Sequence, residues 1–160
     1  MSQHPDAREV RIERIGQHRY KATNRRGGVV TLGSGADPDF TPVELLLAAI
    51  AGCSAVDVDM ITGKRVDPEV FRVLSEGLKV RDEDGNRLAD LKVTFEVTFP
   101  EGPDGDRARA MVPRAIGQSR DRLCSVGRTV MLGTPVDYGE GLVGDWVVAD
   151  PSDVGGTDED

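Results

Sequence analysis

Two cysteines, Cys53 and Cys124, are the residues of this chain best suited to redox chemistry. Cys53 lies inside the apolar run LLLAAIAGCSAVDVDM, and Cys124 lies in DRLCSVGRT. Free cysteine often packs in a core much as alanine does, so an inert Cys53 is one interpretation. The other is thiol chemistry, in which a peroxide oxidises Cys53 to a sulfenic acid and Cys124 condenses with it to a reducible disulfide. The residue types alone leave both interpretations open.

Activation of Cys53 would need a positive charge nearby, because the thiolate is the reactive form of cysteine. Cys53 lies about eleven residues into the helix that we predict around it, whereas the helix dipole acts only within the first turn. The charge must therefore come from another segment. Arginine is the natural donor, since it stays cationic and binds carboxylates in a fork.

Length, charge and composition limit the classes of function. The 160 residues fit one domain over residues 1–148, followed by an acidic tail over 149–160 that we predict to be disordered. A net charge of -8 argues against nucleic acid and anionic membranes as partners. The longest apolar stretch is shorter than a membrane span and no secretory signal is visible, so we expect a cytoplasmic protein. Two cysteines and two histidines show no metal-ligand spacing, and we expect no metal or cofactor.

The elements that must position the cysteines can be read from hydrophobic periodicity. Thr41, Pro42 and Glu44 form a capping-box pattern that begins a helix ending near Arg65. A second helix is expected over residues 107–123. Alternation and turn residues predict strands at 9–15, 18–23, 29–34, in two segments within 68–102, and within 134–144. Runs of strands around two helices favour an α+β fold.

The first predicted helix is apolar on nearly all sides up to about residue 56, so it needs cover on all sides. One small sheet covers one face. A second subunit could cover the remaining faces of the helix without a second sheet in the same chain, and this suggests a homodimer. A single strongly curved sheet that wraps the helix is the alternative.

The segment FTPVELLLAAIAGCSAVDVDMI resembles the central helix of the OsmC/Ohr family, and DRLCSVGRTV resembles the family's second cysteine segment. The resemblance extends over roughly residues 8–140. It implies an intertwined α+β homodimer in which an antiparallel sheet wraps two central helices. It also implies a peroxidase that reduces organic hydroperoxides at the expense of a dithiol, with Cys53 as peroxidatic and Cys124 as resolving cysteine. Glu44 matches the glutamate that orients an activating arginine.

The activating arginine of this family comes from upstream of the helix. Here the turn NRRGG offers Arg26, which we prefer, and then Arg25, although both also suit a solvated hairpin turn. Arg128, four residues after Cys124, is a further cation.

Helical geometry separates Glu44 from Cys53. A separation of nine positions in the sequence places the two side chains nearly opposite on a straight helix. We therefore expect a bend in the helix or a glutamate that serves the cysteine of a neighbouring subunit. Besides the peroxidase, a non-catalytic dimeric stress or ligand-binding protein and a thiol redox sensor remain as alternatives.

Overall fold

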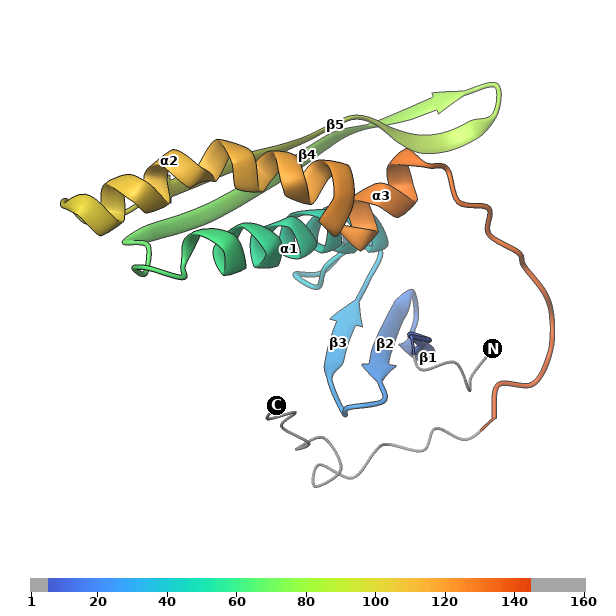
Figure 1. The fold of residues 1–160 in the computed structure, drawn as a ribbon. Coiled ribbons are helices and arrows are strands. Elements are labelled where there is room, and N and C mark those ends of the chain that lie inside the picture. Colours follow the sequence, from blue (N-terminus) through green and yellow to red (C-terminus); the bar gives the residue numbers. More distant parts are fainter. Residues whose placement is uncertain (1–5, 145–160) are drawn as a thin grey trace. The chain divides into compact units, whose positions relative to one another are not determined.

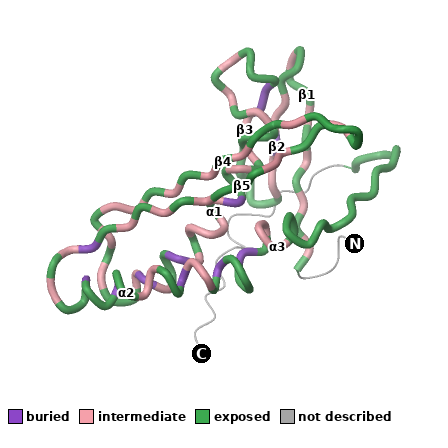
Figure 2. Tube along the Cα trace, turned by 90° about the horizontal axis from the view of Figure 1, so that it is seen from above, coloured by how far each residue is buried: buried purple, intermediate pink, exposed green. Residues whose placement is uncertain are grey.

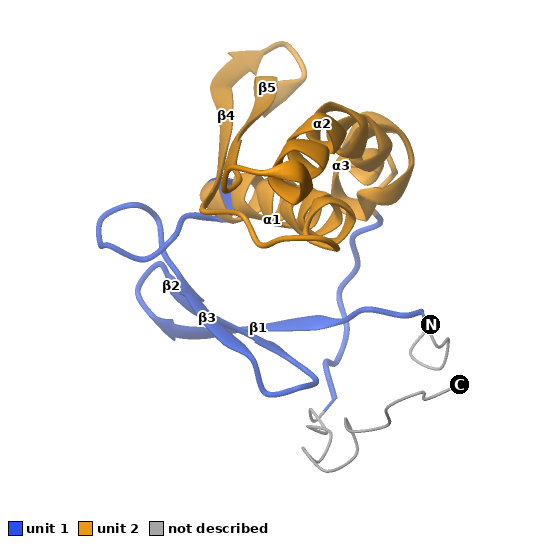
Figure 3. Cartoon of the chain, turned by 60° about the vertical axis from the view of Figure 1, so that its left-hand side comes forward, with its two compact units in different colours: residues 1–43, 137–160 blue, residues 44–136 orange. Residues whose placement is uncertain are grey.

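The computed structural model describes residues 6–144, which form two compact units. Among the described residues, unit 1 comprises 6–43 and 137–144, and unit 2 comprises Glu44–Val136 (Figure 3). The elements are β1 (Val10–Gly16), β2 (Arg19–Asn24), β3 (Val29–Leu32), α1 (Pro42–Thr62), β4 (Val70–Asp82), β5 (Gly85–Thr98), α2 (Pro103–Gln118), the π-helical turn η1 (Ser119–Leu123) and α3 (Ser125–Met131) (Figure 1). The α+β class and the antiparallel pairing expected from the sequence are confirmed.

Unit 1 is an antiparallel meander of β1, β2 and β3. Its second turn closes because the Asn24 side-chain oxygen accepts hydrogen bonds from the backbone N–H groups of Arg26 and Gly28, at 2.9 and 3.0 Å. Gly27 sits between them with a φ of 83°, a conformation that glycine adopts without strain. The NRRGG turn predicted from the sequence is therefore a hairpin turn.

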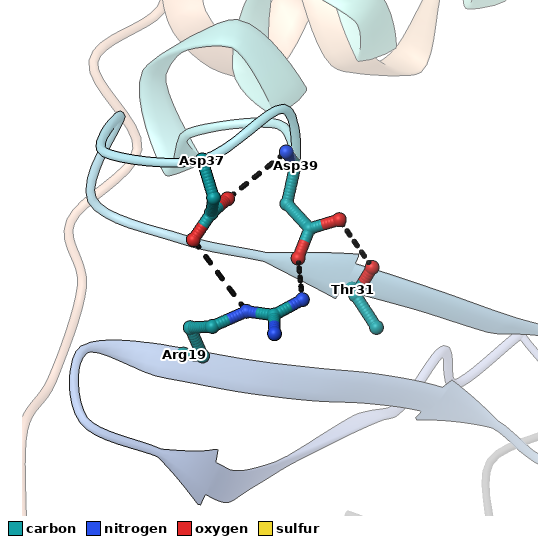
Figure 4. A network of polar contacts seen from close by, with 4 residues as sticks. All are labelled: Arg19, Thr31, Asp37 and Asp39. Atoms are coloured by element: carbon teal, nitrogen blue, oxygen red, sulfur yellow. Dashed lines mark hydrogen bonds and ion pairs between the residues drawn. The ribbon is translucent and has the colours of Figure 1, made fainter.

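An ion-pair network fastens the loop before α1 to the meander (Figure 4). The Arg19 guanidinium binds Asp39 at 2.6 Å and Asp37 at 3.5 Å, and Thr31 donates a hydrogen bond to Asp39 at 2.9 Å. The hydrogen bonds from Arg19 and Thr31 hold the pKa of the Asp39 carboxyl below its usual range. The network is exposed to solvent, so it orders the loop more than it stabilises the fold.

Unit 2 is built on the long β4–β5 hairpin, whose register shifts once between Glu76 and Leu78. Phe71 and Phe95 pack edge to face across the hairpin, with ring centroids 6.4 Å apart. Alternate residues of β5 line one cavity together with residues of α1, α2 and α3, so the helices cover one face of the hairpin (Figure 1).

Helix α2 packs through small residues. Gly105, Ala108, Ala115 and Ser119 are buried at helical spacing. Figure 2 shows that buried positions alternate with exposed ones along α2. The predicted helix at 107–123 corresponds to α2 with η1, and Pro113 lies inside α2 without ending it. Cys124 follows η1 directly and caps α3.

Helix α1 matches the predicted helix to within a few residues, but one chain leaves much of it uncovered. Only Ile50, Val58 and Thr62 are buried within it, while Val56 and Met60 are 58% and 68% exposed. From the sequence we expect the apolar stretch to be too short to span a membrane. By length and composition alone, however, helix α1 is long and apolar enough to do so. The central helix of a soluble protein passes the same test.

Two expectations concern the C-terminal part of the chain. The strand expected within residues 134–144 is wrong, because these residues have no regular structure and are exposed. Val136 and Tyr138 are 66% and 93% exposed, so their apolar surface packs against no strand within the described residues. The acidic tail at 149–160 lies outside the described residues.

Candidate functional site

The fold of unit 2 brings Cys53 of α1 and Cys124, between η1 and α3, to the same place. The two sulfur atoms and a carboxylate oxygen of Asp57 all lie within 4.8 Å of one another. Both cysteines are free thiols. A disulfide requires a sulfur separation of about 2.05 Å, so a small approach of the two side chains would allow a bond between them.

The Cys124 sulfur is buried and surrounded by hydrogen-bond donors. It is 1% exposed and accepts hydrogen bonds from the Ser54 hydroxyl at 3.4 Å and from the Gly127 backbone N–H at 3.2 Å. Burial by itself raises the pKa of Cys124, and the Asp57 carboxylate adds to that effect. The hydrogen bonds from Ser54, Gly127 and Cys53 outweigh both, and they hold the pKa of Cys124 below its usual value.

The Cys53 thiol has the opposite tendency. Burial is the main reason that its pKa is raised above the usual value, and the neighbouring Cys124 sulfur adds to the effect. The backbone N–H groups of Val126 and Ser125 compensate only in part. Within one chain, Cys53 is therefore the less acidic of the two thiols.

Asp57 and Ser119 complete the polar cluster. The Ser119 hydroxyl, 2% exposed at the start of η1, donates a 2.8 Å hydrogen bond to Oδ2 of Asp57. Neither residue was among those predicted from the sequence. Asp57 lies four residues after Cys53, and this helical spacing places the two on one face of α1, a signal that would have identified it.

Next to the cluster lies a largely apolar cavity of about 280 Å³. Its polar lining includes Ser54, Ser119, Arg120 and Cys124, and its apolar lining comes from α1, β5, α2 and α3. The Arg120 guanidinium binds the neighbouring Asp121 carboxylate at 2.6 and 2.9 Å. The cavity can hold an alkyl group beside the Cys124 sulfur.

Glu44 lies in the first turn of α1 and lines a different, shallow depression with Leu47, Ala51, Val73 and Ser75. This position agrees with the separation of Glu44 from Cys53 expected on a straight helix.

The candidate arginines lie in different units of the chain. Arg25 binds the Glu9 carboxylate through Nε at 2.7 Å, and Arg26 lies in the same hairpin turn of unit 1. Arg128 in α3 donates to the Asp121 backbone carbonyl at 2.9 Å, which holds its guanidinium against η1. The cysteines belong to unit 2, as does Arg128.

The donor set of the cluster also resembles a metal-binding group. Two thiols and one carboxylate are ligands that suit Zn²⁺. The sequence shows no such spacing because the ligands come from two distant segments.

One protein family matches most of the chain. The family described as OsmC-like protein matches residues 33–139 of the chain. An uncharacterized protein of Mycobacterium tuberculosis is 31% identical over 127 residues, which are 79% of this chain and 90% of that protein.

Solved structures share the fold. A hypothetical protein from Aquifex aeolicus VF5 superposes with a TM-score of 0.64 at 23% identity, over 81% of this chain and 90% of that one. An OsmC-like protein from Mycoplasma pneumoniae superposes with a TM-score of 0.64 at 14% identity, over 80% and 89% of the two chains.

Proposed function

The chain belongs to the OsmC-like protein family, and from this we propose that it is a thiol-dependent peroxidase that reduces organic hydroperoxides. The observation that carries the proposal is the pairing of Cys53 with Cys124, whose sulfur atoms lie within 4.8 Å of each other. A dithiol would be the reductant, and the reducing cytoplasm would keep both thiols available.

In the first step the Cys53 thiolate attacks one oxygen of the hydroperoxide. The O–O bond breaks, the alcohol leaves with a proton, and Cys53 becomes a sulfenic acid. Because burial raises the pKa of Cys53 within one chain, this step needs a cation. We assign that role to Arg26, or else to Arg25, with Glu44 as the residue that orients the guanidinium.

In the second step the Cys124 sulfur attacks the sulfenic sulfur of Cys53. The S–O bond breaks, a disulfide forms and water leaves. The lowered pKa of Cys124 supports this role, because it raises the fraction of attacking thiolate. A dithiol then reduces the disulfide by two exchange reactions and returns both thiols.

The cavity beside Cys124 favours an apolar substrate. Its lining includes Leu91, Val93, Phe95 and Met131. An alkyl or fatty-acid hydroperoxide would bury its chain there, whereas hydrogen peroxide would gain nothing from the apolar wall. We therefore expect organic hydroperoxides to have the higher kcat/KM.

Steady-state turnover tests the proposal. Protein is supplied with excess dithiol and cumene hydroperoxide, and the peroxide consumed per chain is measured. A peroxidase consumes many equivalents, whereas a redox sensor consumes about one and a ligand-binding protein none. Consumption of one equivalent or less would contradict the proposal, and Cys53→Ser serves as the inactive control.

A further inference from the structure

We propose that the Asp57 carboxylate is the proton acceptor when Cys124 closes the disulfide with Cys53. This inference rests on the proposed function, because it names the residue that assists its second step. It assigns a chemical role to a side chain that the two-cysteine scheme leaves out.

The position of Asp57 carries the proposal. A carboxylate oxygen of Asp57 lies within 4.8 Å of both sulfur atoms, and a general base can act over such a distance through one water molecule. Asp57 is half-buried, one helical turn after Cys53, so the backbone of α1 fixes its distance from the sulfenic acid.

Ser119 fixes the orientation of the carboxylate. Its hydroxyl donates to Oδ2 of Asp57 from η1, five residues before Cys124. One short segment therefore supplies both the attacking sulfur and the group that orients the base. Carboxylates held in this way serve as general bases in many enzymes.

The proton balance of the second step gives such a group a role in every chain where the Cys124 thiol is still protonated. The Cys124 thiol loses a proton as its sulfur bonds to Cys53, and the hydroxide leaving Cys53 must gain one to depart as water. Asp57 accepts the first proton and returns it to the leaving hydroxide. The carboxylate ends unchanged, and the products are one disulfide and one water.

A purely electrostatic role for Asp57 predicts the opposite sign. The negative charge of Asp57 disfavours the Cys124 thiolate. If charge were its only effect, Asp57→Asn would make that thiolate more abundant and would speed disulfide formation. If Asp57 accepts the proton, the same substitution slows disulfide formation.

The test separates the two steps of the reaction in the full chain. Reduced protein is mixed with one equivalent of cumene hydroperoxide. At timed intervals the sulfenic acid is trapped with dimedone and the free thiols are counted by intact mass. The variants are Asp57→Asn, Asp57→Glu and Asp59→Asn, the last being an exposed carboxylate two residues further along α1. Asn keeps the acceptor for Ser119, and circular dichroism verifies that each variant is folded.

We expect Asp57→Asn to form the sulfenic acid at the wild-type rate and to retain it at least about tenfold longer. Asp57→Glu should restore much of the rate, and Asp59→Asn should behave as wild type. Disulfide formation in Asp57→Asn at the wild-type rate or faster would overturn the proposal.

A second oxidant keeps the inference testable if the peroxide does not react. Oxidised glutathione can form a mixed disulfide on Cys53, the less buried of the two thiols, with release of one glutathione. Cys124 then attacks the Cys53 sulfur, loses its thiol proton as before, and the second glutathione leaves. Slower resolution in Asp57→Asn supports the role of Asp57 even if the peroxidase activity itself is absent. Unchanged resolution in this assay overturns that role.

Discussion

At the scale of single residues, the two cysteines differ because their hydrogen-bond partners differ. The Cys124 sulfur accepts from Ser54 and Gly127, and its pKa is lowered, whereas burial dominates at Cys53 and raises its pKa. Contacts within one chain thus lower the pKa of Cys124, the proposed resolving thiol. Cys53, the proposed peroxidatic thiol, needs a cation to lower its pKa, and we propose that an arginine of the N-terminal hairpin supplies it.

The pH dependence of Cys124 follows from its donors. An unfolded thiol has a pKa of about 8.5. Because folding lowers the pKa of Cys124, its thiol ionises at a lower pH in the folded protein than in the unfolded chain. In Cys53→Ser, where one thiol remains and a hydroxyl replaces the other, thiolate absorbance should appear with a midpoint below pH ~8.5. Stability gained from this thiolate is present above the unfolded pKa and is lost as the pH falls through the folded pKa.

Ser54→Ala in the Cys53→Ser background is the matched control for this titration, because it removes one donor to Cys124. Its midpoint should lie higher than that of Cys53→Ser. A midpoint at or above the ordinary thiol value in Cys53→Ser would contradict the account of Cys124.

The arginine assignment predicts a separable effect on the first step. Arg26→Met should slow sulfenic acid formation roughly 10²-fold, the usual cost of removing one electrostatic contact in an active site. Resolution by Cys124 should not change. Rapid-quench mass spectrometry measures both rates, with Arg14→Met on the exposed face of β1 as control. A large effect in Arg25→Met alone would transfer the role to Arg25, and no effect in either would remove both.

At the scale of elements, helix α2 leads directly into η1 and so positions Cys124. The position of Cys124 therefore depends on how α2 packs against the end of β5. A Cβ on Gly105 would overlap the Pro100 backbone carbonyl oxygen, whereas a Cβ on Gly117 meets open space. Gly105→Ala should therefore destabilise the fold by about 1–3 kcal/mol. Gly117→Ala should be neutral or stabilise it by up to about 1 kcal/mol. Urea unfolding measures both, and equal effects would contradict the packing of α2.

The elements could be predicted where the local pattern was strong. Alternation along β5 and the Ala- and Leu-rich run of α1 predicted both elements, and the glycine-containing turns predicted the hairpins. The strand within residues 134–144 failed because the alternation at TPVDYGEGLVG is weak and these residues gain no partner strand within the described chain. Strand formation there depends on tertiary pairing that a local pattern does not encode.

The candidate site could be predicted only in part. Both cysteines were found, because the two motifs resemble a known family. Asp57 could have been predicted from its spacing of four residues after Cys53, but it was not among the predicted site residues. The π-helical turn η1 brings Ser119 to the cluster and Arg120 to the neighbouring cavity, and no periodicity in the sequence reveals that such a turn follows α2.

At the scale of the whole molecule, the apolar surface of α1 predicts self-association. Exposed apolar side chains such as Val56 and Met60 are unfavourable in water, and a second copy of the chain would bury them. We expect a homodimer of twice 17.2 kDa by light scattering.

Met60→Glu places a charge on this apolar surface and should shift the protein toward monomer and lower its peroxidase activity. Gln17→Glu adds the same charge in the exposed β1–β2 turn and should remain dimeric. A wild-type protein that is monomeric at micromolar concentration would contradict the dimer.

The central claim is that Cys53 and Cys124 form a working redox pair. Its most direct test is to add about one equivalent of cumene hydroperoxide to reduced protein and to measure intact mass and free thiols. The account predicts rapid loss of both thiols and of two hydrogens, and a persistent sulfenic acid in Cys124→Ser. Thiols that remain unchanged after prolonged exposure would contradict the account and would make Cys53 a packing residue of an OsmC-like fold.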